Sequence, residues 1–135
     1  MTRAFLDFNY RAQLHYIHNL VTEKTIDLDW HRAAPDGVSK IEHYQHCVKN
    51  LLEVIKGEIE HEETSILFIP SNFLIILGFS DLFVRTEPGL VAGFYAAGTL
   101  KGITVVVSPE ADRYTLMLFD LLKADKVTKI KFPED

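Results

Sequence analysis

The segment that begins at Gly93, GFYAAGTLKGITVVVSPEADRYTLMLFD, constrains the fold more than any other part of the chain. Its β-branched and aromatic residues gather in three short runs that predict strands, at Phe94–Leu100, Ile103–Val107 and Tyr114–Phe119. Lys101 and Gly102 separate the first two runs, and a two-residue connection with glycine second favours a tight hairpin turn with positive φ angles. The segment therefore predicts a β-meander.

The middle run of this segment, Ile103–Val107, is apolar almost throughout. Such a run is typical of a strand that is covered on both faces, because a strand with one wet face alternates apolar and polar residues. Helices from elsewhere in the chain are therefore expected to cover one face of the meander.

Two stretches have the periodicity of amphipathic helices. The first runs from about Thr2 to Lys24, with apolar residues at Leu6, Tyr10, Leu14, Ile17 and Val21. The second begins at about Lys40, within the capping box Ser39-Lys40-Ile41-Glu42, and its apolar face consists of Ile41, Tyr44, Val48, Leu51, Leu52, Ile55 and Ile59. Gly57 weakens its last turn, and an acidic run at 58–63 is unfavourable at a helix C-terminus, so this helix should end before or within that run.

The remaining segments supply shorter elements. Extended segments are expected at Thr25–Trp30, Ser65–Ile69 and Val127–Phe132. Ser71 or Asn72 is placed to cap a short helix, Phe73–Leu77, that ends at Gly78. Trp30 is interpreted as a hydrophobic plug of the core.

Length and composition limit the class of protein. A chain of 135 residues with 47% hydrophobic and 24% charged residues is most simply one domain, 1–135, with its own hydrophobic core. The net charge of −5 without a basic run argues against a nucleic-acid partner. The single cysteine, Cys47, excludes an internal disulfide and fits a reducing compartment. No signal peptide is apparent, and the longest apolar run, 66–79, is interrupted and too short to cross a bilayer, so we expect no membrane partner.

Together these patterns predict an α+β domain in which two amphipathic helices pack on a small mixed sheet or meander.

Polar residues that could carry chemistry form no recognisable site. His15 and His18, and also His43 and His46 beside Cys47, have the i, i+3 spacing that can hold zinc, but HExxH, CxxC and a linking carboxylate pattern are missing. Neighbours on a helix point about 100° apart, so His46 is poorly placed to activate Cys47, which is interpreted as a small core residue. The acidic run after the second helix is interpreted as a solvated face. We assign no catalytic, cofactor-binding or metal-binding residue and no cofactor.

Four stretches follow one another as helix and link, long helix, strand with capped turn and short helix, and hairpin with a further strand. They are LHYIHNLVTEKTIDLDW, SKIEHYQHCVKNLLEVIKGEIEHEET, ILFIPSNFLIILGF and FYAAGTLKGITVVVSPEADRYTLMLFD. In the last stretch, Gly98–Gly102 has the form G-x-L-x-G, and Val105–Pro109 has the form V-x-V-x-P. Over roughly residues 5–120, this order resembles a segment of the major capsid proteins of tailed bacteriophages, especially the T-even-like branch.

The resemblance implies the fold of the axial domain of that family. It implies a structural virion protein without catalysis, which self-associates as hexamers or pentamers in a capsid shell. Its partners would be copies of itself or other virion proteins, and it would be made in the host cytoplasm and reside in the virion. Members of the family are usually longer, with an N-terminal arm, an extended loop and further strands, so the chain would be a fragment or a shortened relative.

An apolar loop is expected at Phe79–Val91, and such a loop either tucks under its domain or meets a partner. We therefore expect this loop and the hairpin turn to contact neighbouring subunits. The candidate contact residues are Phe79, Leu82, Phe83, Leu90, Lys101 and Gly102.

Two alternatives remain open at the level of sequence. If the two long helices pack antiparallel, the histidine pairs approach one another and the chain is a small metal-binding or metal-dependent α+β protein. A virion accessory module that binds one protein partner would differ from a capsid subunit mainly in lacking self-association.

Overall fold

The computed structural model describes residues 15–28, 34–91, 94–108, 111–123 and 125–133. The strands are β1 (Val21–Asp27), β2 (Ser65–Ile69), β3 (Phe83–Val91), β4 (Phe94–Leu100), β5 (Ile103–Val107), β6 (Thr115–Asp120) and β7 (Lys126–Lys131). The helices are α2 (Lys40–Glu58), α3 (Ser71–Gly78) and two short 3₁₀ helices, η1 (Glu62–Thr64) and η2 (Leu121–Lys123). Residues 15–18 form a further helical turn. The architecture is α+β, as the sequence predicts.

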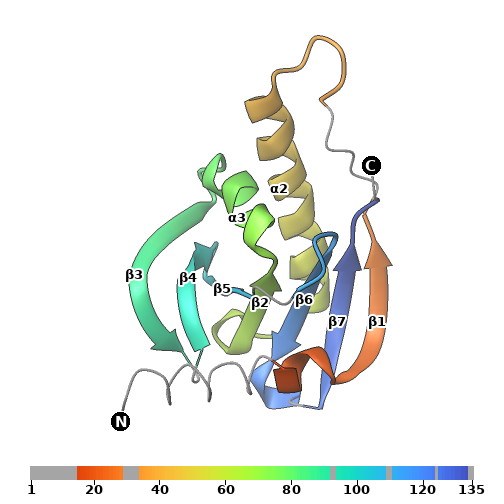
Figure 1. Ribbon diagram of the computed structural model, residues 1–135, viewed down its shortest axis with the longest axis vertical. Coiled ribbons are helices and arrows are strands. Elements are labelled where there is room, and N and C mark those ends of the chain that lie inside the picture. Colours follow the sequence, from red (N-terminus) through yellow and green to blue (C-terminus); the bar gives the residue numbers. More distant parts are fainter. Residues whose placement is uncertain (1–14, 29–33, 92–93, 109–110, 124, 134–135) are drawn as a thin grey trace.

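The seven strands form one mixed sheet in the order β1-β7-β6-β2-β5-β4-β3, which Figure 1 shows from β1 at one edge to β3 at the other. β1 runs parallel to β7 and β2 parallel to β5, and the other neighbours are antiparallel. Leu67 of β2 pairs with Val105 of β5 on one side and with Leu118 of β6 on the other. The predicted meander is therefore wrong at its third strand, because β2 is inserted between β5 and β6.

Two buried clusters cover the opposite faces of the sheet. On one face, Leu67 and Ile69 of β2 pack with residues of α2 and α3. On the other face, Ile66 and Phe68 pack with Ile17 from the helical turn before β1. Successive side chains of a strand point to opposite faces, and all residues of β2 are buried, so this strand belongs to both clusters.

Helix α2 begins and ends within the predicted limits. The Ser39 hydroxyl accepts a hydrogen bond from the Glu42 N–H at 3.1 Å, which satisfies one of the free amides of the first turn. The buried residues of the helix are Tyr44, Cys47, Val48, Leu51, Leu52 and Ile55. Ile41 departs from the predicted stripe, since it is 51% exposed.

The β4–β5 hairpin has the predicted turn. Lys101 and Gly102 have φ angles of 49° and 89°, and Leu100 pairs with Ile103 across the turn. A type I′ turn needs positive φ at both central residues, which is least costly for glycine. β5 is covered on both faces as predicted, because Ile103 and Val106 are fully buried in different clusters.

The N-terminal helix ends earlier than predicted. Ile17 is buried as expected, but Val21–Lys24 belong to β1, and Val21 is 67% exposed. β1 pairs with β7 near the other end of the chain, a contact that helical periodicity cannot show. The earlier part of this predicted helix and Trp30 lie outside the described residues. Within the described part of the chain, no helix has the length and apolarity needed to cross a membrane.

Two predictions about the middle of the chain are also wrong. α3 begins at Ser71 with Pro70 in the N-cap position, so neither Ser71 nor Asn72 caps it with a side chain. The predicted loop Phe79–Val91 contains β3, which pairs with β4 at the edge of the sheet. Pro88 concealed this strand in the sequence, because proline is confined to edges and irregularities of sheets, and it lies where the β3–β4 register shifts.

β3 leaves no room for a side chain at Gly98 of β4. A Cβ atom on Gly98 would overlap the carbonyl oxygen of Val84 and would lie 2.8 Å from the nearest ring atom of Phe83. The absence of a side chain therefore permits this strand pairing and the burial of Phe83 against it.

We predict that Gly98→Ala lowers the free energy of unfolding by about 1–3 kcal/mol, because a backbone oxygen and a buried ring must both move aside. Gly57→Ala is the matched control, since a Cβ there has no neighbour within 4 Å and the residue lies in α2. It should raise the free energy of unfolding by about 0.5–1 kcal/mol. Urea denaturation measures both changes, and an unchanged midpoint for Gly98→Ala would contradict this packing.

Candidate subunit-contact surface

The predicted contact residues do not form one surface. Phe79 is 39% exposed, and Lys101 and Gly102 are exposed at the hairpin turn. Leu82 is half-buried and packs against the cluster that α2 and α3 cover. Leu90 lies in β3, and its side chain lies outside the described part of the structure.

Phe83 is not available as a contact residue. Its side chain is 8% exposed, belongs to the cluster beneath α2 and α3, and lies against Gly98. Phe83→Asp would place a charge in this core and unfold the domain, rather than weaken an assembly of folded copies. Phe83 therefore anchors β3 to the core.

An exposed apolar surface lies where the C-terminal end of α3 meets α2. Ile75 and Phe79 are 66% and 39% exposed, and side chains four residues apart on a helix share a face. The Phe79 ring lies 5.8 Å from the Tyr44 ring of α2, measured between centroids. The carbonyl oxygen of Phe79 accepts a hydrogen bond from the Gln45 side chain at 3.0 Å. These contacts join the two helices and hold Phe79 in place.

Ile41 is a further exposed apolar side chain of α2, one turn before Tyr44. We call Ile41, Ile75 and Phe79 the α2–α3 patch. The Lys40 ammonium lies 5.6 Å from the centre of the Tyr44 ring, so a charged group borders the patch. Protein–protein interfaces commonly combine an apolar centre with a polar rim. A group of exposed apolar side chains indicates a binding surface more strongly than the same residues scattered singly.

β3 provides a second exposed surface, because it forms one edge of the sheet. An edge strand presents backbone N–H and C=O groups that can pair with another strand. Val84 of this strand is 57% exposed. The register shift between Arg85 and Gly89 interrupts the edge, and Pro88 has no backbone N–H to donate there. Only part of β3 is therefore suited to pairing with another chain.

The β4–β5 turn lies beside η1. A Cβ atom on Gly102 would lie 3.0 Å from Oε2 of Glu62, so the acidic side chain sits close to the turn. Lys101 is exposed at the same turn. The turn therefore offers charged groups, unlike the apolar α2–α3 patch.

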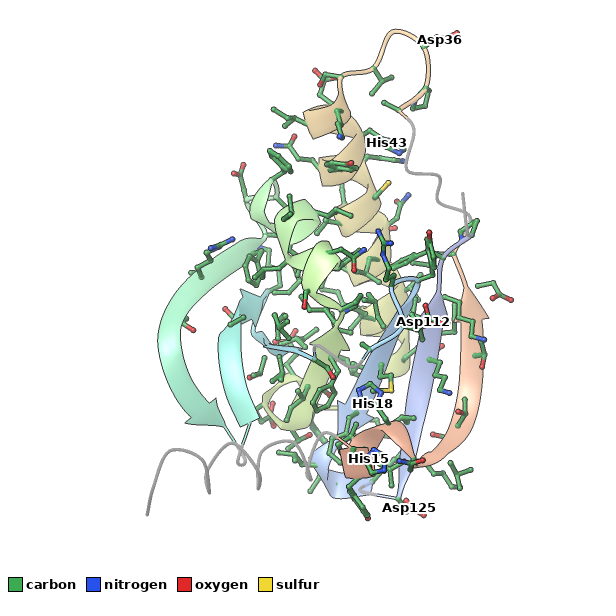
Figure 2. The ribbon with its side chains drawn as sticks, in the orientation of Figure 1. His15, His18, Asp36, His43, Asp112 and Asp125 are labelled. Atoms are coloured by element: carbon green, nitrogen blue, oxygen red, sulfur yellow. The ribbon has the colours of Figure 1, made fainter. Side chains whose placement is uncertain are left out.

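The two histidine pairs do not converge. His15 and His18 lie on the helical turn that packs on the sheet face opposite α2, whereas His43 lies on α2 at the other end of the molecule (Figure 2). Nε2 of His18 lies 2.7 Å from Oγ of Ser108, and Nε2 of His43 lies 3.7 Å from Sγ of Cys47. The hypothesis that these pairs meet between two antiparallel helices is therefore wrong.

Two lysine side chains lie beside the acidic run at 58–63. Nζ of Lys24 lies 2.8 Å from the Glu58 carboxylate, and Nζ of Lys123 lies 3.4 Å from that of Glu60. Among the residues that the structure describes, no group of three or more His, Cys, Asp or Glu side chains is placed to hold a metal ion. The arrangement agrees with a solvated, partly neutralised face.

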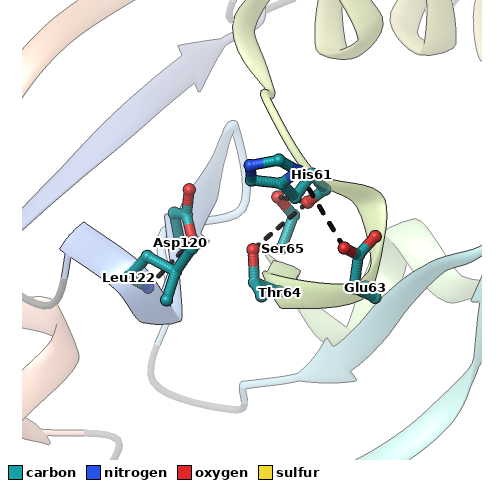
Figure 3. Close-up of polar contacts among 6 residues, drawn as sticks. All are labelled: His61, Glu63, Thr64, Ser65, Asp120 and Leu122. Atoms are coloured by element: carbon teal, nitrogen blue, oxygen red, sulfur yellow. Dashed lines mark hydrogen bonds and ion pairs between the residues drawn. The ribbon is translucent and has the colours of Figure 1, made fainter.

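Figure 3 shows how the acidic run passes into β2. The carbonyl oxygen of His61 accepts hydrogen bonds from the hydroxyls of Thr64 at 3.3 Å and Ser65 at 2.8 Å. At the end of the neighbouring β6, the Asp120 carboxylate accepts a hydrogen bond from the Leu122 N–H at 2.9 Å. Local side-chain hydrogen bonds of this kind shape turns, so these polar groups have a structural role.

No protein-family profile, curated protein or solved structure matches this chain.

Sequence reasoning did not identify Ile41 and Ile75 as surface residues. Ile41 fits the apolar stripe of α2, but it lies in the first turn of the helix and remains half-exposed. Ile75 lies in the run FLIIL, where every residue is apolar, so periodicity cannot distinguish the buried side of α3 from the exposed side. Ile75 lies four residues before Phe79, which is a predicted contact residue. This spacing is the sequence feature that could have indicated that Ile75 is exposed.

The thiol of Cys47 provides a test of the α2 packing. Cys47 is 6% exposed, and burial raises the pKa of its thiol from 9.0 to about 12. The thiolate is the reactive species, so we predict that the native protein resists a thiol reagent at mildly alkaline pH and that the urea-unfolded protein consumes one equivalent. The pKa is higher in the folded state, so stability should stay constant with respect to this group below pH 9 and fall as the pH rises above it. Rapid labelling of the native protein would contradict the burial of Cys47.

Proposed function

We propose that this protein is a self-associating structural subunit, of the kind that builds the capsid shell of a tailed bacteriophage, and that it acts through contacts between copies without a catalytic step. The observation that carries the proposal is the ordered resemblance over roughly residues 5–120. Several elements on which the resemblance depends occur in that order: the long helix α2, then β2 with α3, and then the β4–β5 hairpin.

The exposed surfaces support self-association. The α2–α3 patch places three large apolar side chains at the surface, and a few side chains buried at the centre of an interface carry most of its binding energy. β3 is a different surface, at the edge of the sheet. Contact between two different surfaces of identical copies is head-to-tail and generates rings when the rotation closes. Rings are the form that capsomers take.

The chemistry of the patch indicates how it would contribute. Removing exposed apolar area from water yields roughly 25 cal/mol per Å², while association also costs rotational and translational freedom. A patch of three side chains cannot hold two subunits together alone. It would act as the apolar centre of a larger contact, with Lys40 and Gln45 in the polar rim.

We predict that Ile75→Glu weakens self-association by about tenfold or more, because it places a charge at the centre of the contact. Ile75 is 66% exposed, so the substitution should leave the fold intact. Leu122→Glu is the matched control, since Leu122 is 68% exposed and lies in η2, away from the patch. Light scattering across a wide concentration range measures the mass, and negative-stain imaging shows the form of the largest species.

The proposal expects concentration-dependent growth for the wild type and Leu122→Glu, reduced growth for Ile75→Glu, and rings or sheets in the images. A wild type that stays monomeric at every concentration would contradict self-association and favour an accessory module. Equal growth of all variants would remove the α2–α3 patch from the contact.

A further inference from the structure

The sheet face opposite α2 carries a hollow that the proposed function does not use. Its volume is about 140 Å³, well above the roughly 15 Å³ that one water molecule needs. Its lining includes His18, Asp112, Thr115, Met117, Lys129 and Lys131. We call it the lysine hollow. Most of the described residues that line it carry groups that form hydrogen bonds.

The strand β7 places both lysines in this hollow. Lys129 and Lys131 are two residues apart, so their side chains leave the same face of the sheet. Ile130, between them, is fully buried in the cluster beneath α2 and α3, which fixes the direction of its neighbours. Across the antiparallel pair with β6, Lys131 lies opposite Thr115, and Lys129 lies opposite Met117. The two ammonium groups, the Thr115 hydroxyl and the methionine therefore share one surface.

His18 closes one side of the hollow. Its Nε2 atom lies 2.7 Å from the hydroxyl oxygen of Ser108, and Ser108 is fully buried after β5. This contact attaches the helical turn before β1 to a buried residue at the end of β5. In Figure 2, His18 lies over the strands in the lower part of the molecule, and Asp112 lies above it. The wall of the hollow is therefore built from three separate parts of the chain.

The charges of the lining favour a negative ligand. Among the described residues of the lining, Lys129 and Lys131 carry positive charge, and Asp112 carries the one carboxylate. That carboxylate accepts a hydrogen bond from the Tyr114 N–H at 3.0 Å, which ties it to its own turn. Asp27 of β1 lies beside Lys131 in the parallel register and adds a negative charge outside the lining. The described part of the lining therefore carries an excess of positive charge.

We infer that the lysine hollow binds an oxyanion, either a phosphate or a carboxylate group of a ligand. Two ammonium groups and a hydroxyl can donate hydrogen bonds to its oxygens, and hydrogen bonds between ionised groups are the strong ones. The half-buried position of Lys129 reduces the competition of water for the same donors. This inference rests on the geometry of β6 and β7 and does not depend on self-association.

The test is an NMR titration of the full chain with inorganic phosphate, and separately with acetate, at constant ionic strength maintained with chloride. Saturating shifts are expected at the amides of Thr115, Met117 and Lys129. Lys129→Gln and Lys131→Gln should each weaken binding by about tenfold. Lys126→Gln is the matched control, because Lys126 lies on the same strand but faces the other side of the sheet, and it should leave the affinity unchanged.

The two ligands distinguish the sources of the oxyanion. Binding of phosphate alone supports a phosphate-bearing ligand, and binding of acetate supports a carboxylate-bearing one. Shifts that do not saturate, or that persist in the Lys129→Gln/Lys131→Gln double variant, overturn the inference. Thermal unfolding of each variant verifies that lost binding does not reflect lost structure.

Discussion

The fold depends on covering both faces of β2. Its residues are all buried, with Leu67 and Ile69 directed to one cluster and Ile66 and Phe68 to the other. Each fully buried aliphatic or aromatic side chain of this kind contributes about 1.5–3 kcal/mol relative to exposure. Neither face can therefore be left open to water without a large loss of stability. The apolar stripe of α2 covers one face, and the turn that holds Ile17 contributes to the cover of the other.

This two-sided core assigns different surfaces to different properties. The side of α2 and α3 carries the α2–α3 patch, and the opposite face carries the lysine hollow. The two edges, β1 and β3, lie far apart in the sheet order. A contact between copies through the patch would leave the hollow open, so the proposed assembly and the proposed oxyanion binding should respond to different substitutions.

Locally determined features could be predicted from the sequence. The capping box at Ser39 fixed the start of α2, and Gly102 identified the hairpin turn, since each depends on residues within a few positions. β2 and β5 were recognised as strands from their apolar runs. The pairing of β2 with β5 could not be predicted, because parallel strands are joined by a long crossover and no local sequence pattern shows which strand it leads to.

The candidate surfaces were harder to predict for a related reason. Exposure of Ile75 depends on which side of α3 meets the sheet, and a uniformly apolar run does not encode that side. Val21 fits a helical stripe, yet its segment pairs with β7 because strand pairing overrides local periodicity. Lys129 and Lys131 alternate with apolar residues as in any half-exposed strand, and only the sheet order brings them to His18 and Thr115.

The position of β2 between β5 and β6 is tested most directly by the backbone nuclear Overhauser effects of β2 in a uniformly labelled sample. Leu67 should show contacts with Val105 in a parallel pattern and with Leu118 in an antiparallel pattern. That result would place β2 at the centre of the sheet, between the two clusters. Direct contacts between β5 and β6, with β2 at an edge of the sheet, would contradict the central position of β2.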